Sequence, residues 1–354
     1  MRSRPARKMY ERYELERSPF AQKPTQRDIA ALVRENKEDL NKLGTDRFKE
    51  QFLVRRTIET SGKERRLVYP EARLRAVHER LKYHLNKIIQ PSYLFSPRKN
   101  RSQRDNAEVH LSAFQYLTLD IKQFYPSTTR RMIRNSLAVQ FGMAGDVAGL
   151  IAHVATADDR ACFGSPLTPV LASLVHRPMF DEISDLCVSY GLSHSIWVDD
   201  LTISGPKIPG AFIAEIRRII ASYGLRSHKL KYYTGNKAVF VTGVGIVGSN
   251  LVAKKKVELR SKELWRALKN AETLDEIDTA TTRLLAHLGG IKQIVGKSSK
   301  RGQKLSNEMH SIRQKREKAF RKNTERLINE ASGLRRLSPE EQEARREEID
   351  ALPF

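Results

Sequence analysis

The sequence is poor in cysteine and contains no long apolar run. Its 354 residues include two cysteines, Cys162 and Cys187, and neither stands in a metal-binding spacing. This usage excludes a disulfide scaffold and favours a reducing, cytoplasmic compartment. No stretch approaches the roughly 18 apolar residues of a membrane-spanning helix. The Arg-rich first residues are followed by no apolar segment of the secretory type. We therefore expect a cytoplasmic protein without a membrane partner.

Positive charge is in large excess. The chain has 64 Lys and Arg against 41 Asp and Glu, a formal net charge of +23, which exceeds what solubility requires. Each cation that neutralises a phosphate releases a counterion and so adds salt-dependent affinity. The charge therefore favours a nucleic acid as partner, although a ribosome or a membrane surface would attract the same charge.

The apolar pattern predicts strands and helices in a mixed order. This order is typical of an α+β domain with helices on one side of an antiparallel sheet. Beyond residue 261 the pattern is helical, and Thr273 and Glu276 form a capping box. The expected elements are a hairpin over 52–69, a helix through 74–88, irregular chain over 92–112, a strand over 114–119, helices over 126–140 and 168–191, a hairpin over 195–204, a helix over 211–223, and strands over 238–247 and 251–258.

Three aspartates stand at the ends of apolar strands. Asp199 and Asp200 lie at the tip of the hairpin over 195–204, and Asp120 ends an earlier strand. An Asp-Asp pair is also ordinary turn chemistry. Gathered carboxylates repel one another, however, and stay ionised only beside cations. Their hard oxygen atoms suit Mg²⁺ or Mn²⁺, and two such ions support attack of a hydroxyl on an α-phosphate. In a basic protein this set predicts a polymerase.

Five segments, in order, resemble the motifs of reverse transcriptases. They are GKERRLVYP of the fingers hairpin, LTLDIKQFYPS of motif A, FGSPLTPVLASL of motif B, IWVDDLTISG of motif C and GLRSHKLKYYTG of motif D. The resemblance covers about residues 50–295. It implies a right-hand polymerase fold, with fingers, a palm built on an antiparallel sheet and a helical thumb, and an RNA-directed DNA polymerase activity.

The resemblance also implies roles for individual residues. Asp120, Asp199 and Asp200 are the expected catalytic residues and, with the backbone of Ile121, hold two Mg²⁺ ions, or Mn²⁺ in their place. Tyr125 matches the steric gate that rejects a ribose 2′-hydroxyl. The other expected nucleotide-binding residues are Arg66, Phe163, Gly164, Ser165 and Lys231.

Motifs B, C and D depart from the family pattern. Phe163 stands where the family usually has Gln, so a side-chain hydrogen bond near the nucleotide is lost. Trp197 and Val198 replace the commoner Tyr-Ala ahead of the aspartate pair. His228 and Leu230 make motif D atypical, which weakens the assignment of Lys231.

Two further segments resemble signatures of retron reverse transcriptases. Asn106 to His110 fits NAxxH, and Val241-Thr242-Gly243 fits VTG. Without the resemblance they would be loop hydrogen-bonders and a strand end. With it, Asn106, His110, Val241, Thr242 and Gly243 are expected to bind RNA. Such enzymes reverse-transcribe part of a structured non-coding RNA from a 2′-hydroxyl primer into branched multicopy single-stranded DNA, in antiphage defence.

The implied partners are the structured RNA, its cDNA, dNTPs and an effector protein. Two other readings stay open: another defence or group II intron-like reverse transcriptase, and a catalytically silent RNA-binding scaffold. The expected domains are an N-terminal helical extension over 1–50, fingers and palm over 51–260, a thumb over 261–296 and a basic helical extension over 297–354. Residues 297–326, with eleven Lys or Arg against three Glu, form either a solvated helix or an RNA-holding element.

Overall fold

The computed structural model describes residues 11–60, 62–235, 237–334 and 338–350. Its contacts divide the chain into two units, Met1–Thr242 with Ile246–Ser249, and Gly243–Gly245 with Asn250–Phe354. Each unit has an apolar core of its own. The expected domain boundary at residue 260 falls inside helix α12 (Lys255–Lys269), several residues beyond this division.

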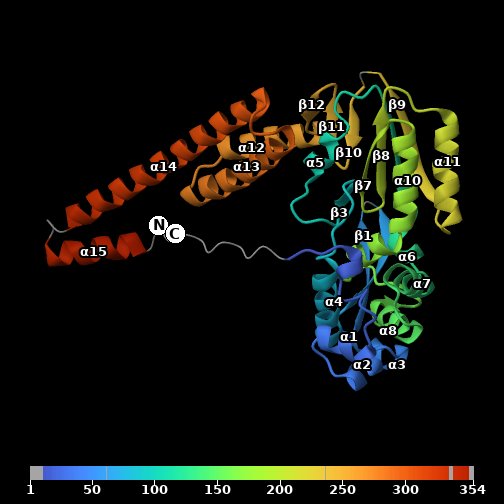
Figure 1. Ribbon diagram of the computed structural model, residues 1–354. Helices are drawn as coiled ribbons and strands as arrows, with labels where there is room; N and C mark the ends of the chain where they lie inside the picture. The colour runs from blue at the N-terminus through green and yellow to red at the C-terminus, as the bar shows by residue number, and fades with distance from the viewer. Residues whose placement is uncertain (1–10, 61, 236, 335–337, 351–354) are drawn as a thin grey trace. The chain divides into compact units, whose positions relative to one another are not determined.

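The centre of the first unit is a five-stranded sheet of order β3-β7-β8-β4-β9 (Figure 1). β8 pairs antiparallel with β7 and β4, β4 pairs antiparallel with β9, and β3 pairs parallel with β7. Helices α10 and α11 cover the sheet, and Phe180 and Phe212 bury fully in the shared core. The bounds are β3 (Leu94–Ser96), β4 (Gln115–Ile121), β7 (Ser193–Trp197), β8 (Asp200–Gly205), β9 (Ser227–Thr234), α10 (Arg177–Ser189) and α11 (Gly210–Ser222).

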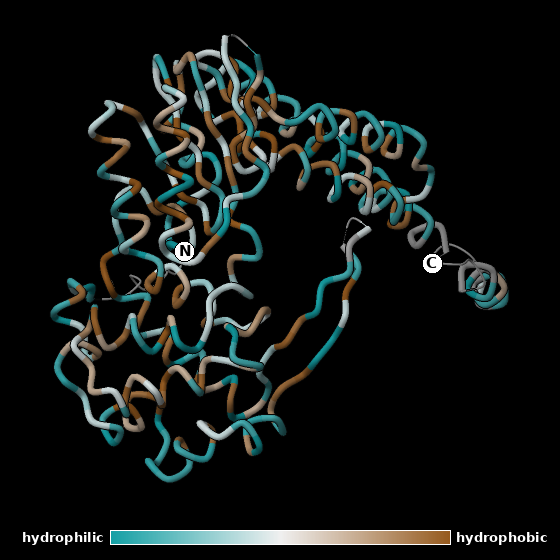
Figure 2. The backbone as a smooth tube through the Cα atoms, turned by 90° about the vertical axis from the view of Figure 1, so that its right-hand side faces the viewer, coloured by the Kyte–Doolittle hydropathy of each residue, from teal (hydrophilic) through white to brown (hydrophobic). Residues whose placement is uncertain are grey.

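Helices form the other core of the same unit, around Leu74, Ile133 and Leu171. A hairpin of β1 (Leu53–Thr60) and β2 (Lys63–Pro70) extends from these helices as a two-stranded arm (Figure 2). The other elements are η1 (Leu15–Arg17), α1 (Gln26–Leu32), α2 (Lys37–Leu43), α3 (Asp46–Lys49), η2 (Glu50–Phe52), α4 (Ala72–Leu85), α5 (Gln103–Glu108), α6 (Phe124–Ser127), α7 (Arg130–Phe141), α8 (Gly145–Ala155), β5 (Thr156–Ala157), β6 (Arg160–Ala161) and α9 (Thr168–Val175).

The mixed α/β class and both predicted hairpins are confirmed, but several elements differ. Residues 92–112 were expected to be irregular, yet they contain β3 and α5. The helix expected over 168–191 is two helices, because Pro178 in the first turn of α10 cannot donate a helical hydrogen bond across His176. The helix expected over 126–140 is likewise divided, into α6 and α7. Strand β9 and helix α8 were not predicted.

The second unit is mainly helical. Helices α12, α13 (Leu274–Val295) and α14 (Lys300–Leu334) pack around Leu284, Leu288 and Leu305. The predicted capping box at Thr273 and Glu276 is present, and α15 (Pro339–Asp350) follows. Strands β10 (Val239–Val241), β11 (Val244–Val247) and β12 (Asn250–Val252) form a small sheet where the chain passes from one unit to the other. Among the described residues, no helix combines the length and apolar character of a membrane span.

Candidate active site

The aspartate pair sits on a tight turn of the central sheet. Trp197 and Asp200 are the last paired residues of β7 and β8, so Val198 and Asp199 form a two-residue turn. Val198 has φ +63°, a conformation that hairpin turns usually assign to Gly or Asn. Holding a β-branched residue there costs roughly 1–3 kcal/mol. The apolar strands on both sides hold this backbone in place, and the turn presents its carboxylates in one fixed position.

Asp120 meets this pair across the neighbouring strand. In the β4/β8 register Asp120 lies directly opposite Asp200, and the Ile121 N–H donates a hydrogen bond of 3.0 Å to the Asp199 carbonyl. The Asp120 side chain is 13% exposed, and its buried Oδ1 has no hydrogen-bond partner among the described residues. The structure therefore gathers the three predicted carboxylates at one end of the sheet.

The cluster is electrostatically unfavourable without cations. Desolvation, together with the negative charges of Asp199 and Asp120, raises the pKa of Asp200 to about 6. Desolvation and the charge of Asp120 also raise the pKa of Asp199, although nearby Lys229 and Arg65 oppose the rise. Additional positive charge beside these carboxylates would stabilise their ionised form.

Lys229, which the sequence analysis did not select, supplies one positive charge. Its ammonium pairs with Asp120 Oδ2, and this hydrogen bond raises the pKa of Lys229. The β4/β9 register shifts between Thr118 and Asp120, and Lys229 has φ +48° in this bulge. A bulge redirects a side chain, which no sequence periodicity reveals. Lys231, the predicted residue, is exposed and opposite Thr118.

The residues present fit a hard divalent cation. The donors are carboxylate oxygens, one of them buried and unpartnered, and their mutual repulsion would fall on cation binding. Within the described part of the chain, no three His, Cys, Asp or Glu side chains are arranged so that they could hold a metal ion as they stand. Asp120, Asp199, Asp200 and the Ile121 carbonyl therefore remain predicted ligands.

Tyr125 and Phe163 face each other beside the aspartates. Their ring centroids are 6.1 Å apart, and desolvation and the charge of Asp199 raise the pKa of Tyr125. Phe124 packs instead against Phe180 and His176, at 6.1 and 5.0 Å between ring centroids. Phe124 therefore faces the core. Tyr125 and Phe163 together form an aromatic wall near Asp199.

The loop of motif B is held against the hairpin. The Val68 N–H donates to the Phe163 carbonyl at 3.0 Å. Gly164 is exposed with φ +118°, and a Cβ there would lie 3.1 Å from Tyr69 Cβ, so only glycine allows this approach. A ligand could therefore approach the loop backbone at this position.

Ser165 of the same loop points inward. Its hydroxyl lies 2.6 Å from His78 Nδ1 and accepts the Leu167 N–H at 3.1 Å. His78 Nε2 bonds the Val154 carbonyl at 2.9 Å, and burial lowers the pKa of His78 to about 4. The Ser165 hydroxyl is thus engaged inside the protein, contrary to its expected nucleotide contact. His78 fixes the loop, and the helical pattern of 74–88 did not single it out.

The hairpin presents Arg65 toward the aspartates. The positive charge of Arg65 lowers the pKa of Asp199, against the larger effect of desolvation. Arg66, the residue chosen by resemblance, is exposed and lies opposite Thr57. Successive strand residues point to opposite faces, so of these two neighbours Arg65 has the better-placed charge. Arg66 stays a prediction.

The two retron-like signatures meet in space. Asn106 Nδ2 donates to Thr242 Oγ1 at 3.2 Å, and Thr242 and Gly243 both have positive φ, as a two-residue type I′ turn requires. Val241 is buried. His110 bonds the hydroxyls of Ser204 and Ser195 at 2.8 and 2.7 Å.

Burial changes the interpretation of this signature. Asn106 and His110 are 1% and 0% exposed, so their side chains are enclosed in the protein, and RNA binding by them stays a prediction. They fix helix α5 to the strands that flank the aspartates and to the VTG turn. Any effect of these two side chains on RNA would act through the position of those elements.

The chain is similar in sequence to curated retron reverse transcriptases. It is 27% identical over 146 residues to the retron Se72 reverse transcriptase of Salmonella heidelberg (strain 579083-10), covering 41% of this chain and 38% of that protein. It is 28% identical over 184 residues to the retron Mx65 enzyme of Myxococcus xanthus, covering 46% and 42%. It is 26% identical over 175 residues to the retron Ec86 enzyme of Escherichia coli, covering 48% and 54%.

These alignments confirm the resemblance to retron-type reverse transcriptases that the motifs indicate. The chain spans about two fifths to a half of the length of these relatives. No protein-family model matches the sequence.

Two solved telomerase structures are also similar. The apo telomerase of Candida tropicalis, truncated from the C-terminal domain, gives a TM-score of 0.41 at 11% identity and covers 62% of this chain and 61% of its own. The telomerase of Candida albicans with a TWJ fragment of telomeric RNA gives 0.44 at 11%, covering 75% and 60%. At these scores we draw no conclusion from the likeness.

Proposed function

We propose that this protein is an RNA-directed DNA polymerase. The observation that carries the proposal is the placement of Asp120 opposite Asp200, with Asp199 on the adjoining turn. The raised pKa values of Asp199 and Asp200 support it, because such a cluster is suited to binding cations. Similarity to retron reverse transcriptases supports the same activity.

In this proposal each part of the site has a task. Asp120, Asp199, Asp200 and the Ile121 carbonyl hold two Mg²⁺ ions, which when bound activate the primer hydroxyl and neutralise the triphosphate. Arg65 of the hairpin and Lys229 of β9 bind the triphosphate, because their charges act on the aspartates. Tyr125 lies against the sugar and excludes a 2′-hydroxyl. The Gly164 backbone and the Phe163 ring border the nucleotide.

We propose that the elements correspond to the parts of a right-hand polymerase. The five-stranded sheet with α10 and α11 would be the palm, and the helical core with the β1–β2 hairpin would be the fingers. Helices α12 and α13 would be the thumb, and α14 and α15 the basic extension.

Primer extension tests the polymerase. With an RNA template, a DNA primer, dNTPs and Mg²⁺, we expect DNA synthesis by the wild type, none by Asp199→Asn, and little incorporation of ribonucleotides. Loss of the ribonucleotide discrimination in Tyr125→Ala would support the steric gate. RNA binding by a wild type that fails to extend any primer would instead support the catalytically silent scaffold.

We propose further that the enzyme is of retron type and makes branched multicopy single-stranded DNA in antiphage defence. The hydrogen bond between Asn106 and Thr242 supports this, because it brings the two signatures together. Protein purified from its native host should carry a structured RNA covalently joined to DNA. Sequencing that finds RNA without linked DNA would reject the retron assignment and leave the polymerase standing.

The second unit offers a basic surface for that RNA. A cavity of about 550 Å³ lies among α12, α13 and α14, and its lining includes exposed Trp265, the cations Arg266, Lys269 and Lys315, and Arg316, which pairs with Asp278. Aromatic and cationic groups together suit unpaired bases and their phosphates. Lys269→Glu with Lys315→Glu should weaken binding of single-stranded RNA by about tenfold. Lys262→Glu, on an exposed face of α12, is the matched control.

A further inference from the structure

The base of the β1–β2 hairpin forms hydrogen bonds with both ends of the segment 158–163. Arg55 and Val68 are directly opposite in the hairpin register. Arg55 Nη1 and Nη2 donate to the Asp158 carboxylate at 2.5 and 3.0 Å, while the Val68 N–H donates to the Phe163 carbonyl at 3.0 Å. One cross-strand pair therefore holds the segment that leads into the motif B loop.

The orientation of the Arg55 guanidinium is fixed by further hydrogen bonds. Its guanidinium also donates to Glu50 through Nε and Nη2, at 2.9 and 3.0 Å. A planar guanidinium bound on two edges has little freedom to turn. Asp158 and Asp159, both with positive φ, form the two-residue turn between β5 and β6. The hydrogen bonds from Arg55 lower the pKa of Asp158.

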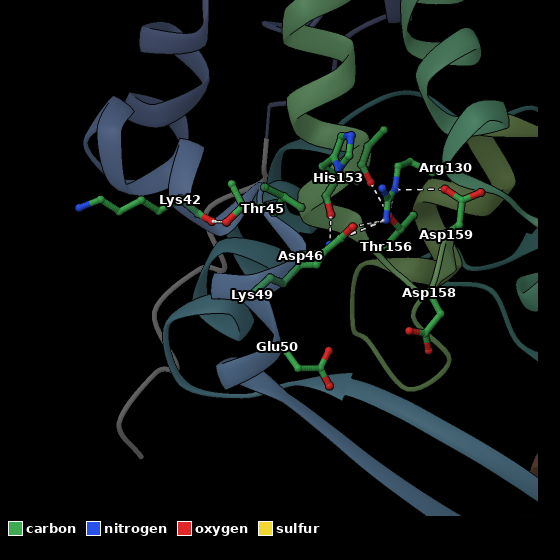
Figure 3. A network of polar contacts seen from close by, with 12 residues as sticks. Lys42, Thr45, Asp46, Lys49, Glu50, Arg130, His153, Thr156, Asp158 and Asp159 are labelled. Carbon is green, nitrogen blue, oxygen red and sulfur yellow. Dashed lines mark hydrogen bonds and ion pairs between the residues drawn. The ribbon is translucent and has the colours of Figure 1, made fainter.

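The other side of the segment is attached to the elements that carry Tyr125. Arg130 pairs with Asp159 at 3.3 Å and with Asp46 at 3.1 Å (Figure 3). The Ala161 N–H donates to the Thr128 carbonyl at 2.9 Å, and Arg160 Nη1 donates to the Pro126 carbonyl at 2.5 Å. The segment thus joins the hairpin to the turn of Tyr125, whose ring faces Phe163.

We infer that Arg55 and Asp158 are a positioning pair that sets the hairpin relative to the nucleotide pocket. Among the described interactions, Arg55 contacts neither the three aspartates of the site nor the aromatic wall. It would therefore act through the hairpin and the segment 158–163. The inference rests on the proposed function for its kinetic consequence, because the hairpin carries Arg65 and the segment ends at Phe163 and Gly164. Its structural consequence, a mechanical link between hairpin and loop, stands without it.

The test uses three variants, Arg55→Gln, Asp158→Asn and the double variant that combines these two substitutions. Arg56→Gln is the control. Asn tolerates the left-handed backbone of position 158, and surface ion pairs contribute little stability, so these variants should fold. Arg56→Gln removes the same charge from the next strand position, on the opposite face. Two quantities are measured: the KM for dNTP and kcat in primer extension, and amide hydrogen exchange of β2 and of residues 158–164.

Each single variant should raise the KM for dNTP about threefold to fivefold and change kcat by less than about twofold. The double variant should match Arg55→Gln, because that single variant already removes the Arg55–Asp158 interaction together with the hydrogen bonds to Glu50. Exchange at 158–164 should accelerate in all three but not in Arg56→Gln, and Arg55→Lys should restore part of the KM. Additive effects, or effects equal to those of Arg56→Gln, would overturn the inference. If the wild type incorporates no dNTP, the proposed function fails, and unchanged exchange would separately refute the link.

Discussion

Asp200 is a residue whose charge opposes folding. Its pKa is raised from 3.8 to about 6, so between these values the folded state binds more protons than the unfolded chain. The free energy of unfolding contributed by Asp200 therefore falls as the pH rises through this window. Above about pH 6 the full penalty is present unless a cation relieves it. A cation bound beside Asp200 would therefore stabilise the folded protein.

Replacing this carboxylate should therefore stabilise the protein while it inactivates the site. We predict that Asp200→Asn, with divalent cations chelated at pH 7.5, raises Tm by about 2–4 °C and lowers dNTP incorporation by about 10²-fold or more. Asp185→Asn removes a carboxylate from an exposed position of α10 and should change neither quantity. A lower Tm in Asp200→Asn would show that its charge is already compensated. Thermal unfolding and primer extension are the measurements.

Gly164 is a residue that no side chain can replace without strain. With φ +118° and Tyr69 Cβ at 3.1 Å from an added Cβ, Gly164→Ala should destabilise the protein by about 1–2 kcal/mol and raise the KM for dNTP. Gly210→Ala is the control, because nothing lies within 4 Å of its added Cβ. Urea unfolding measures the difference, and equal effects of the two substitutions would contradict the tight approach of loop and hairpin.

At the scale of elements, His110, just beyond the end of helix α5, supports the β7–β8 hairpin. Removing the imidazole leaves the buried hydroxyls of Ser195 and Ser204 unpaired. His110→Ala should thus lower the free energy of unfolding by roughly 3 kcal/mol. The exposed His310→Ala in the second unit should cost less than about 0.5 kcal/mol. A His110→Ala protein of wild-type stability that has lost RNA binding would favour the direct RNA contact instead.

The sequence predicted the elements whose pattern is local. Apolar residues alternate around Asp199 and recur at helical spacing from Leu74, and these patterns predicted the hairpin and the helix. Burial of one face of a strand or helix imposes such a periodicity on the sequence. Strand β9 escaped prediction because its alternation is nearly absent: almost all its residues are exposed or half-buried at the sheet edge. The sequence did not predict that the helix is interrupted at His176, because apolar residues continue at helical spacing on both sides of this position.

The site shows the same division. Strand ends placed Asp120 beside Asp200, so the three aspartates could be predicted from their motifs. Lys229 could not, because a register shift in β9 redirects it. His78, His110 and Asn106 serve through buried partners distant in the sequence, and a single sequence does not show which loop a buried hydrogen bond will join.

Across the whole molecule, buried neutral histidines control acid stability. Burial lowers the pKa of His78 and His176 to about 4 and that of His110 to about 3, from 6.5. Below pH 6.5 the unfolded chain binds protons that the folded chain does not, so the free energy of unfolding falls as the pH falls toward 4. Each histidine contributes roughly 1.4 kcal/mol per pH unit in this window, against the smaller opposite effect of Asp200.

We predict that the free energy of unfolding decreases between pH 6.5 and 4.5, and that His110→Ala makes this decrease less steep. Urea unfolding at several pH values measures both slopes. The same slope in His110→Ala and the wild type would mean that His110 is protonated in the folded protein.

The two units differ in the charge of their candidate binding surfaces. The basic cavity among α12, α13 and α14 lies wholly in the second unit, whereas the aspartates lie in the first. We therefore expect RNA affinity and catalysis to be separable by mutation, with salt weakening RNA binding more than it alters the chemistry.

We propose that Asp120, Asp199 and Asp200 together hold the catalytic cations. Fe²⁺ bound in place of Mg²⁺ generates hydroxyl radicals in the presence of ascorbate and peroxide, and these cut the backbone beside the metal. Mapping the cuts by mass spectrometry tests the claim without any substrate. We predict cuts near residues 120 and 198–200 that excess Mg²⁺ suppresses and that Asp120→Asn with Asp199→Asn abolishes. Cuts elsewhere, or cuts that persist in this double variant, would contradict the account.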